Sequence, residues 1–320
     1  ATDDRVNSLN YQNIHHIEDL PYWGSFSKIS KTTKVAPRGD SPWAWGELGD
    51  LLVKRLNVPV LFFNVGYEGS TIENWLSSSK GLPTYHSGYK FYFPSNTPYS
   101  YLRITLQNYV ARLGVRVVFW QQGESDGFDN VGEQAYYDAL KEVIATSRKE
   151  FGQNVAWAVA RTSFIDTVHP NIIKAQNRII ADIPQVFAGP DTDTISRYNN
   201  ELHFSNENGR TEITRLAKAW DAALTDNFFT NSTPYLANPV VEISPSCTSS
   251  NAPQLTVDGN YTDFWWNGTK QSKVINANTS TKYQVITRNS TGVYGYSETI
   301  SPAKLYPTTP PVVSAVTTTT

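Results

Sequence analysis

The stretch of the sequence that bears most directly on chemistry is residues 117–126, Val-Val-Phe-Trp-Gln-Gln-Gly-Glu-Ser-Asp. Its apolar half predicts a buried β-strand that ends at Trp120, and a polar turn containing glycine comes directly after it. Ligands of α/β proteins bind beyond the carboxyl ends of the strands, so this turn is a candidate site. Gln122 offers a neutral side-chain amide that can donate hydrogen bonds without titrating. Glu124 and Asp126 offer two carboxylates.

A second polar turn follows the strand predicted before this one. The segment Asn64–Trp75 reads Asn-Val-Gly-Tyr-Glu-Gly-Ser-Thr-Ile-Glu-Asn-Trp, and a helix is predicted to start within it. Ser70 or Thr71 is expected to cap that helix. Gly69 precedes the cap, where a backbone N–H can point at a ligand; on its own it would be an ordinary turn glycine.

Two histidines compete for the role of general base. His203 lies in Glu201-Leu-His-Phe-Ser205, just before the last predicted helix, and follows a Gly-Pro-Asp-Thr-Asp loop. His169 has Asp166 three residues before it, but it opens the helix that contains Lys174-Ala-Gln-Asn. The residues by themselves leave the choice between the two histidines open.

The motif Trp-x-Gln-Gly-Glu-x-Asp, here Trp120 to Asp126, resembles the third signature block of the SGNH-type carbohydrate esterases, in particular the sialate O-acetylesterase-like family. The resemblance implies serine-type hydrolysis of acetyl esters on a glycan, without a metal or organic cofactor. It implies that Gly69 supplies a backbone donor and Gln122 a side-chain donor to the oxyanion. It also implies that His203 is the base and His169 a structural residue, because the family places the segment that matches Lys174-Ala-Gln-Asn before its catalytic histidine. It also implies a flavodoxin-like α/β fold with a three-layer parallel sheet.

The chain departs from the family pattern in two places. The family has an aspartate three residues before its histidine, where this chain has Asn200; an amide can orient the imidazole but cannot stabilise imidazolium as a carboxylate does. Glu201 is a possible substitute. The family's first block, a Gly-x-Ser-type turn with the nucleophile, is not found, and Asp3-Asp4-Arg5-Val6 resembles the segment directly after that block. The nucleophile and its strand are therefore expected upstream of Ala1, and residues 1–320 alone are expected to be inactive.

Three alternatives stay open. Gly123-Glu-Ser-Asp-Gly127 fits the nucleophile elbow of α/β-hydrolases with Ser125 as nucleophile, although residues 126–131 read as a loop rather than a helix. A glycosidase is disfavoured, because Glu124 and Asp126 lie two residues apart on one turn; both are expected to hold that turn, outside direct contact with the substrate. A catalytically decayed sugar-binding protein is the third alternative, and Asn200 keeps it open.

The positioning elements can be predicted from periodicity. Short apolar strands alternate with amphipathic helices from residue 42 to 228, which favours a parallel sheet covered on both faces. One helix is predicted to bury Leu102, Leu106, Tyr109 and Leu113. The other predictions are helices at 42–56, 137–151, 172–183 and 213–224 and strands at 58–64, 115–120, 155–160 and 185–188.

The pattern changes after Phe229. Residues 239–302 contain five or six short segments rich in β-branched and aromatic residues, which predict an Ig-like sandwich with Trp265 or Trp266 in its core and Tyr283 as a tyrosine corner. The predicted domains are an SGNH esterase domain at 1–230, an Ig-like sandwich at 235–305 and a Thr/Pro-rich linker at 306–320 that leads to further domains.

Composition limits which partners and which cellular location are expected. The net charge is −2 with no basic run, so neither nucleic acid nor an acidic membrane is an expected partner, and no apolar run is long enough for membrane insertion. A single cysteine, Cys247, excludes an internal disulfide. The expected partner is an acetylated carbohydrate, and the expected location is outside the cytoplasm of a bacterium, secreted or at the cell surface.

Overall fold

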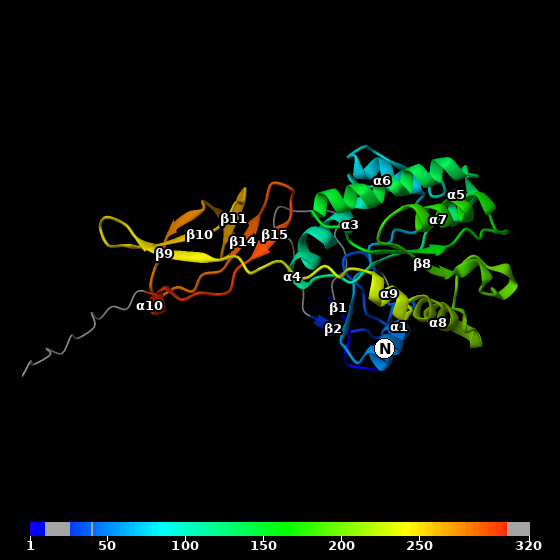
Figure 1. The fold of residues 1–320 in the computed structure, drawn as a ribbon, viewed down its shortest axis with the longest axis horizontal. Coiled ribbons are helices and arrows are strands. Elements are labelled where there is room, and N and C mark those ends of the chain that lie inside the picture. The colour runs from blue at the N-terminus through cyan, green and yellow to red at the C-terminus, as the bar shows by residue number, and fades with distance from the viewer. Residues whose placement is uncertain (10–25, 40, 306–320) are drawn as a thin grey trace, which may run out of the picture. The chain divides into compact units, whose positions relative to one another are not determined.

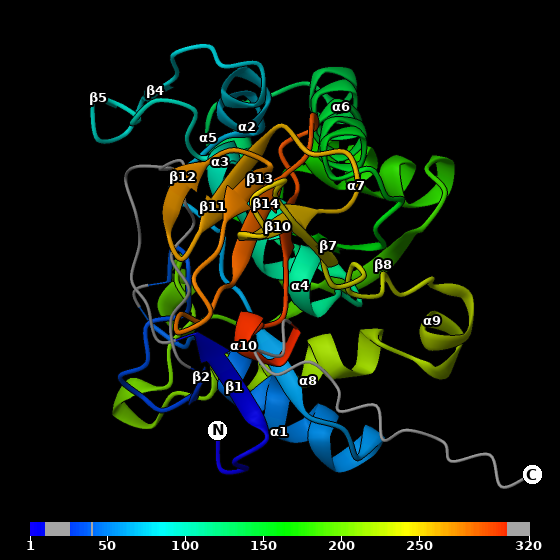
Figure 2. The same cartoon turned by 90° about the vertical axis from the view of Figure 1, so that its left-hand side faces the viewer.

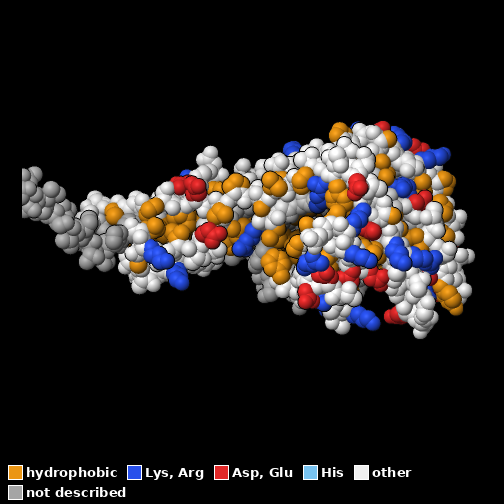
Figure 3. All heavy atoms as spheres, turned by 60° about the horizontal axis from the view of Figure 1, so that its bottom comes forward, with side chains coloured by type: hydrophobic (Ala, Val, Ile, Leu, Met, Phe, Trp, Pro, Cys, Tyr) orange, Lys and Arg blue, Asp and Glu red, His pale blue; other side chains and the backbone are white. Residues whose placement is uncertain are grey.

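The computed structural model describes residues 1–9, 26–39 and 41–305, and the predicted linker at 306–320 lies outside them. The chain divides into two compact units, Ala1–Ala237 and Asn238–Thr320. Figure 1 shows the described helices and strands of both units. Among the described residues, no helix is both long and apolar enough to cross a membrane. Acidic and basic side chains are interspersed over the face of the first unit drawn in Figure 3.

The first unit is a mixed α/β structure. Its strands are β1 (Val6–Leu9), β2 (Phe26–Lys28), β3 (Val60–Phe62), β4 (Tyr85–His86), β5 (Phe91–Tyr92), β6 (Val118–Trp120), β7 (Trp157–Arg161) and β8 (Val186–Asp191). Its α-helices are α1 (Trp45–Leu56), α2 (Ile72–Ser79), α3 (Tyr99–Ile104), α4 (Ala111–Leu113), α5 (Glu124–Phe128), α6 (Glu133–Phe151), α7 (Pro170–Asp182), α8 (Glu212–Ala223) and α9 (Asp226–Asn231). Short 3-10 turns lie at Thr192–Thr194, Tyr198–Asn200 and Glu207–Gly209.

The strands of the first unit do not form the single parallel sheet that the sequence predicts. The described residues form two three-stranded sheets, β2-β1-β3 and β6-β7-β8, and β4 pairs with β5 in a separate hairpin. β6, β7 and β8 are parallel, β1 is parallel to β3, and β2 is antiparallel to β1. Trp45 of α1 stacks on Phe62 of β3 and on Phe119 of β6, with ring centroids 5.9 and 6.1 Å apart. The two sheets therefore share a hydrophobic core without sharing hydrogen bonds.

Helices cover both faces of the β6-β7-β8 sheet. Figure 1 shows α6 and α7 on one side of β8 and α1 and α8 on the other. Helices α1 and α8 pack into a hydrophobic core through Leu48 and Trp220, both of which are fully buried. The predicted helices and strands of residues 42–228 are thus confirmed, with ends shifted by a few residues.

One predicted buried position is wrong. Residues 99–113 are helical throughout, but the segment Thr105–Val110 is a π-helical turn between α3 and α4. Leu102, Leu106 and Tyr109 are buried as predicted, whereas Leu113 is 38% exposed. A π-turn adds residues per turn and rotates the apolar stripe, so a position extrapolated at α-helical spacing leaves the buried face.

The prediction that residues 126–131 form a loop is also partly wrong. The helix α5 starts directly after Gly123, and the N–H of Gly127 donates to the carbonyl of Gly123 at 2.9 Å. Glu124 and Asp126 lie in its first turn. Gly127 has a low helix propensity, so tertiary contacts such as the hydrogen bond from the N–H of Ile72 to the Asp126 carboxylate support this short helix.

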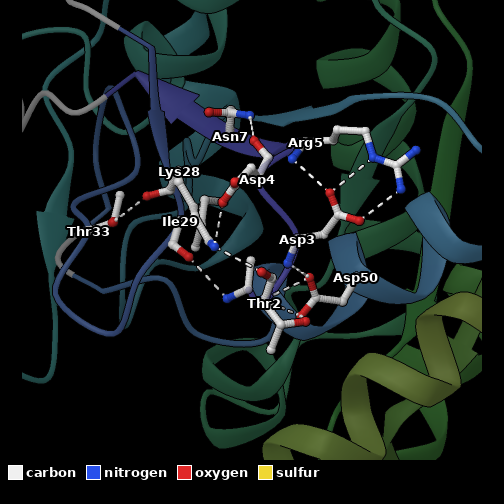
Figure 4. A network of polar contacts seen from close by, with 10 residues as sticks. Thr2, Asp3, Asp4, Arg5, Asn7, Lys28, Ile29, Thr33 and Asp50 are labelled. Carbon is white, nitrogen blue, oxygen red and sulfur yellow. Dashed lines mark hydrogen bonds and ion pairs between the residues drawn. The ribbon is translucent and has the colours of Figure 1, made fainter.

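The first residues of the chain are bound to α1, as Figure 4 shows. The Asp50 carboxylate accepts the backbone N–H groups of Thr2 and Asp3 at 2.7–2.9 Å. Asp3 also pairs with Arg5 at 2.8 Å, and this hydrogen-bonded partner lowers the pKa of Asp3 to about 2. These contacts hold the segment before β1 on α1.

The second unit contains two antiparallel sheets, β13-β10-β9 and β12-β11-β14-β15. Its seven described strands exceed the five or six predicted. Trp266, rather than Trp265, packs with Leu255 and Val285 in the core that both sheets share. The remaining bounds are β9 (Ile243–Cys247), β10 (Pro253–Val257), β11 (Asp263–Trp266), β12 (Thr269–Gln271), β13 (Val274–Asn276), β14 (Val285–Arg288), β15 (Tyr294–Tyr296) and α10 (Pro302–Leu305).

Candidate active site

The turn after β3 presents Gly69 in a left-handed conformation with φ of +66°. Gly69 is exposed, and its N–H has no acceptor within the described residues. A Cβ at this position would overlap the imidazole of His86, so only glycine fits both the backbone angle and the space. Thr71, not Ser70, caps α2: its hydroxyl accepts the N–H of Asn74, and Asn74 in turn accepts the N–H of Thr71.

Gln122 joins this turn to the turn after β6. Its side-chain Nε2 donates to the carbonyl oxygen of Ser70 at 2.9 Å and to the carboxylate of Asp126. Its Oε1 accepts the hydroxyl of Tyr136 at 3.0 Å. Both amide hydrogens are therefore used inside the protein, and Gln122 donates to an oxyanion only by exchanging one of these partners.

Asp126 is fully buried and links the same two turns. Its carboxylate accepts the N–H of Ile72, the first residue of α2, at 3.0 and 3.1 Å. Burial raises its pKa to about 7, although the hydrogen bonds from Gln122 and Ile72 act in the opposite direction. Asp126 therefore holds the start of α2 against the Gln122 turn.

Glu124 belongs to a second group of charges. Burial raises the pKa of its carboxyl, and the charge of Asp193 acts in the same direction. Asp193 accepts the N–H and the hydroxyl of Ser163 at 3.1 and 2.6 Å, which ties the segment after β8 to the segment after β7. The positive charge of Arg197 lies near both carboxylates, and its own pKa is lowered by burial.

Arg197 reaches the residues on either side of His203, a contact that sequence analysis missed. Its guanidinium lies over the ring of Phe204 at 4.1 Å and over that of Phe164 at 4.7 Å. Its Nη1 donates to the carbonyl oxygen of Leu202 at 2.6 Å. The only signal in the sequence was its i,i+4 spacing from Asp193, which is not specific.

His203 is exposed, and its ring has no hydrogen-bond partner among the described residues. Asn200, the expected orienting residue, is exposed and has a φ of +56°. The carboxylate of Glu201, the other candidate, pairs with Arg210 at 2.5 Å. The structure thus brings Gly69 and Gln122 together, but it leaves the imidazole of His203 unoriented by these residues.

His169, the alternative base, and Ser125, the alternative nucleophile, lie in other surroundings. His169 precedes α7, its N–H donates to the hydroxyl of Ser163 at 2.9 Å, and its ring packs against Gly127. Ser125 lies in the first turn of α5 and is not among the residues with positive φ, so the strained backbone of a nucleophile elbow is not seen there.

Gln176, inside the Lys174-Ala-Gln-Asn segment, is fully buried. Its Nε2 donates to the carbonyl oxygens of Gln122 and Thr162 at 3.0 and 2.9 Å, which supports the turn after β6 from α7. The sequence pattern alone assigned no role to Gln176.

A cavity of about 330 Å³ opens beside the His203 segment, and Arg197, Tyr198, Arg210, Glu212 and Arg215 contribute to its lining. Arg210 donates to the carboxylate of Glu212 at 2.9 Å and lowers the pKa of Glu212 to about 2. Within the described residues, no group of three or more His, Cys, Asp or Glu side chains is placed to hold a metal ion.

Comparison with known families gives one match. The family model described as carbohydrate esterase, sialic acid-specific acetylesterase, matches residues 51–222, a range that contains Gly69, Gln122 and His203. No curated protein and no solved structure gives a significant match. The match covers more than half of the 320 residues. The chain belongs to the carbohydrate esterase family of sialic acid-specific acetylesterases.

Proposed function

We propose that the protein is a carbohydrate O-acetylesterase that hydrolyses acetyl esters on a glycan by a serine mechanism. The observation that carries the proposal is the hydrogen bond between Gln122 Nε2 and the carbonyl oxygen of Ser70. It brings the amide of Gln122 to the turn in which the N–H of Gly69 has no acceptor among the described residues. A backbone donor and a side-chain amide at one turn are what an oxyanion hole requires.

The roles derive from acyl-transfer chemistry. A serine oxygen attacks the acetyl carbonyl while His203 accepts the serine proton. The oxyanion accepts the N–H of Gly69 and an amide hydrogen of Gln122, which gives up its hydrogen bond to the carbonyl of Ser70 in exchange. Collapse of the tetrahedral intermediate releases the sugar hydroxyl, which takes the proton from His203. Water then attacks the acetyl-serine, with His203 again as base, and acetate leaves. Asn200 is proposed to orient His203 once the glycan is bound.

The nucleophile is proposed to lie on a further strand outside residues 1–320, between β3 and β6. Two observations support this placement. The edges of β3 and β6 that face away from β1 and β7 carry no strand partner among the described residues, and both strands are only partly buried whereas β7 is largely buried. Ser70, the serine beside Gly69, does not fit the role of nucleophile. Its hydroxyl donates to the carbonyl oxygen of Tyr67 and accepts the indole N–H of Trp75.

Acetate release tests the proposal. A polypeptide extended at its N-terminus in the natural sequence should release acetate from 9-O-acetyl-N-acetylneuraminic acid or from acetylated xylo-oligosaccharides, and residues 1–320 alone should not. A serine-directed fluorophosphonate should label the extended polypeptide at the added segment. Labelling of Ser125 in either protein would instead support the α/β-hydrolase alternative.

The sugar-binding alternative is favoured by one observation, the exposed and unpartnered ring of His203 among the described residues. If the extended polypeptide binds either glycan but releases no acetate and takes no label, that alternative is correct.

We further propose that the first unit has the flavodoxin-like SGNH fold and that the second is an Ig-like module. The hydroxyl of Tyr283 accepts the N–H of Asn278, five residues upstream, at 2.9 Å, which is the kind of contact that a tyrosine corner makes. Secretion or attachment to a bacterial cell surface is proposed with this domain pairing. Sequence flanking the chain in its gene would test it, because a signal segment is expected there.

A further inference from the structure

The hairpin of β4 and β5 adjoins the proposed oxyanion turn. Figure 2 shows this hairpin projecting from the first unit beside α2. In its register Tyr85 pairs with Tyr92, and His86 pairs with Phe91. The side chains of a β-hairpin alternate between its faces, so the two tyrosines share one face and His86 lies on the other. His86 is 4% exposed, whereas Tyr92 is 71% exposed.

His86 fixes the hairpin to the turn. Its imidazole fills the space into which a side chain at position 69 would extend, directly against Gly69. The Nδ1 atom of the same ring accepts the N–H of Tyr89 at 3.1 Å. One ring therefore touches the backbone of the proposed oxyanion donor and also holds the hairpin tip at Tyr89.

The hairpin has a second anchor on α2. Asn74 donates from its side-chain amide to the hydroxyl of Thr84 at 2.5 Å and to the carbonyl oxygen of Tyr85 at 3.2 Å. The N–H of Phe93 donates to the carbonyl oxygen of Thr84 at 3.0 Å. Since Asn74 also belongs to the capping box of α2, the hairpin and the turn before α2 are held by the same residue.

Tyr89 places a large aromatic ring in solvent at this point. It is 72% exposed, and its ring centroid lies 4.7 Å from that of His86. Tyr85 and Tyr92 differ, because their rings pack on each other with centroids 5.0 Å apart on the opposite face of the hairpin. Tyrosine gives a rigid surface that is apolar on its faces and polar at its hydroxyl, and ordering it on binding costs little entropy.

We propose that Tyr89 is a glycan-binding residue whose ring stacks on a pyranose of the acetylated substrate, and that His86 positions it relative to Gly69. The proposal rests on the proposed function, since it takes the acetyl carbonyl to lie at Gly69. A sugar presents patches of C–H groups on its ring faces and hydroxyls at its rim, and this matches an exposed phenol. When the acetyl carbonyl is held at Gly69, the attached sugar lies beside Tyr89, because the imidazole of His86 contacts both Gly69 and the Tyr89 ring.

Glycan binding to residues 1–320 tests the proposal without requiring catalysis. The probes are 9-O-acetyl-N-acetylneuraminic acid and an acetylated xylo-oligosaccharide, each titrated and observed by saturation-transfer NMR. Tyr89→Ala is expected to raise the dissociation constant of the bound probe roughly tenfold, as expected for truncation of an aromatic contact. Tyr89→Phe should keep most of the affinity, because it retains the ring.

Tyr92→Ala is the matched control, because Tyr92 is equally exposed on the same hairpin but on the face away from His86. It should bind as tightly as the unchanged protein. Equal weakening by Tyr89→Ala and Tyr92→Ala, no weakening by Tyr89→Ala, or no binding of either probe would each overturn the proposal. Near-ultraviolet circular dichroism establishes that the variants are folded.

The kinetic test separates this proposal from the proposed function. In the extended polypeptide, Tyr89→Ala should raise KM for the acetylated glycan roughly tenfold, whereas Tyr92→Ala should leave hydrolysis of both the glycan and 4-nitrophenyl acetate unchanged. If the esterase proposal fails, neither ester is hydrolysed by any variant, while the dependence of binding on Tyr89 remains measurable. A loss of 4-nitrophenyl acetate hydrolysis in Tyr89→Ala would assign Tyr89 to the catalytic turn and overturn the stacking role.

Discussion

Replacing Asp126 by asparagine should change how the stability of the first unit depends on pH. In the folded protein burial raises the pKa of this carboxyl from 3.8 to about 7. In the unfolded chain the group has its ordinary value. Between these two values the folded state holds a proton that the unfolded state has lost, so stability falls as pH rises. Below pH 4 both states are protonated, and above pH 7 both are ionised.

The magnitude can be worked out from the size of the shift. One pKa unit corresponds to about 1.4 kcal/mol, so a shift of about three units amounts to ~4 kcal/mol across the whole window. Asparagine keeps an oxygen that accepts the N–H of Ile72 but does not titrate. Relative to Asp126→Asn, the unchanged protein should therefore lose about 1.4 kcal/mol of unfolding free energy for each pH unit between pH 4.5 and 6.5.

Urea unfolding of residues 1–320, followed by tryptophan fluorescence at half-unit steps from pH 4.5 to 8.5, measures this difference. The second unit is identical in both proteins, so its unfolding cancels in the comparison. A stability difference that stays constant over this range would refute the reasoning, because it would mean that Asp126 is ionised throughout with an ordinary pKa. A difference that increases with pH would refute it as well.

The other predictions concern the polypeptide extended at its N-terminus. Gln122→Ala should lower turnover of an acetyl ester roughly 10²–10³-fold, the scale for loss of an oxyanion donor. It should also lower the free energy of unfolding by ~1–3 kcal/mol, because the carbonyl of Ser70 and the carboxylate of Asp126 lose a donor. A turnover loss under threefold would mean that the amide is structural only. His203→Ala should abolish hydrolysis in a steady-state assay while Ser125→Ala stays near full activity, and the reverse pattern would identify Ser125 as the nucleophile. Arg197→Lys should lower kcat more than it raises KM, because lysine loses the planar contact with the residues beside His203; unchanged kcat would show that Arg197 does not position the base.

Local pattern was enough to predict most elements of the first unit. The apolar run before Trp120 and the polar turn after it predicted a strand and a site, and the structure places β6 and Gln122 there. Periodicity failed at Leu113, because a π-turn inserted earlier in the helix is not visible as a change in apolar spacing. Composition failed at α5, because Gly127, Asp129 and Asn130 indicate a loop whereas residues 124–128 form a short helix.

What the sequence by itself determined is which residues are candidates for the site: Gly69, Gln122 and His203 are predicted by motif and by their order in the chain. Tertiary structure decided their partners. Gln122 uses both amide hydrogens on Ser70 and Asp126, and Asp126 is buried against Ile72, 54 residues away in the chain. Hydrogen-bond partners and burial at such separations depend on how distant segments pack, and packing leaves no period of 2 or 3.6 in the sequence. His86 shows this most clearly, because nothing local to it indicates that its ring lies against Gly69.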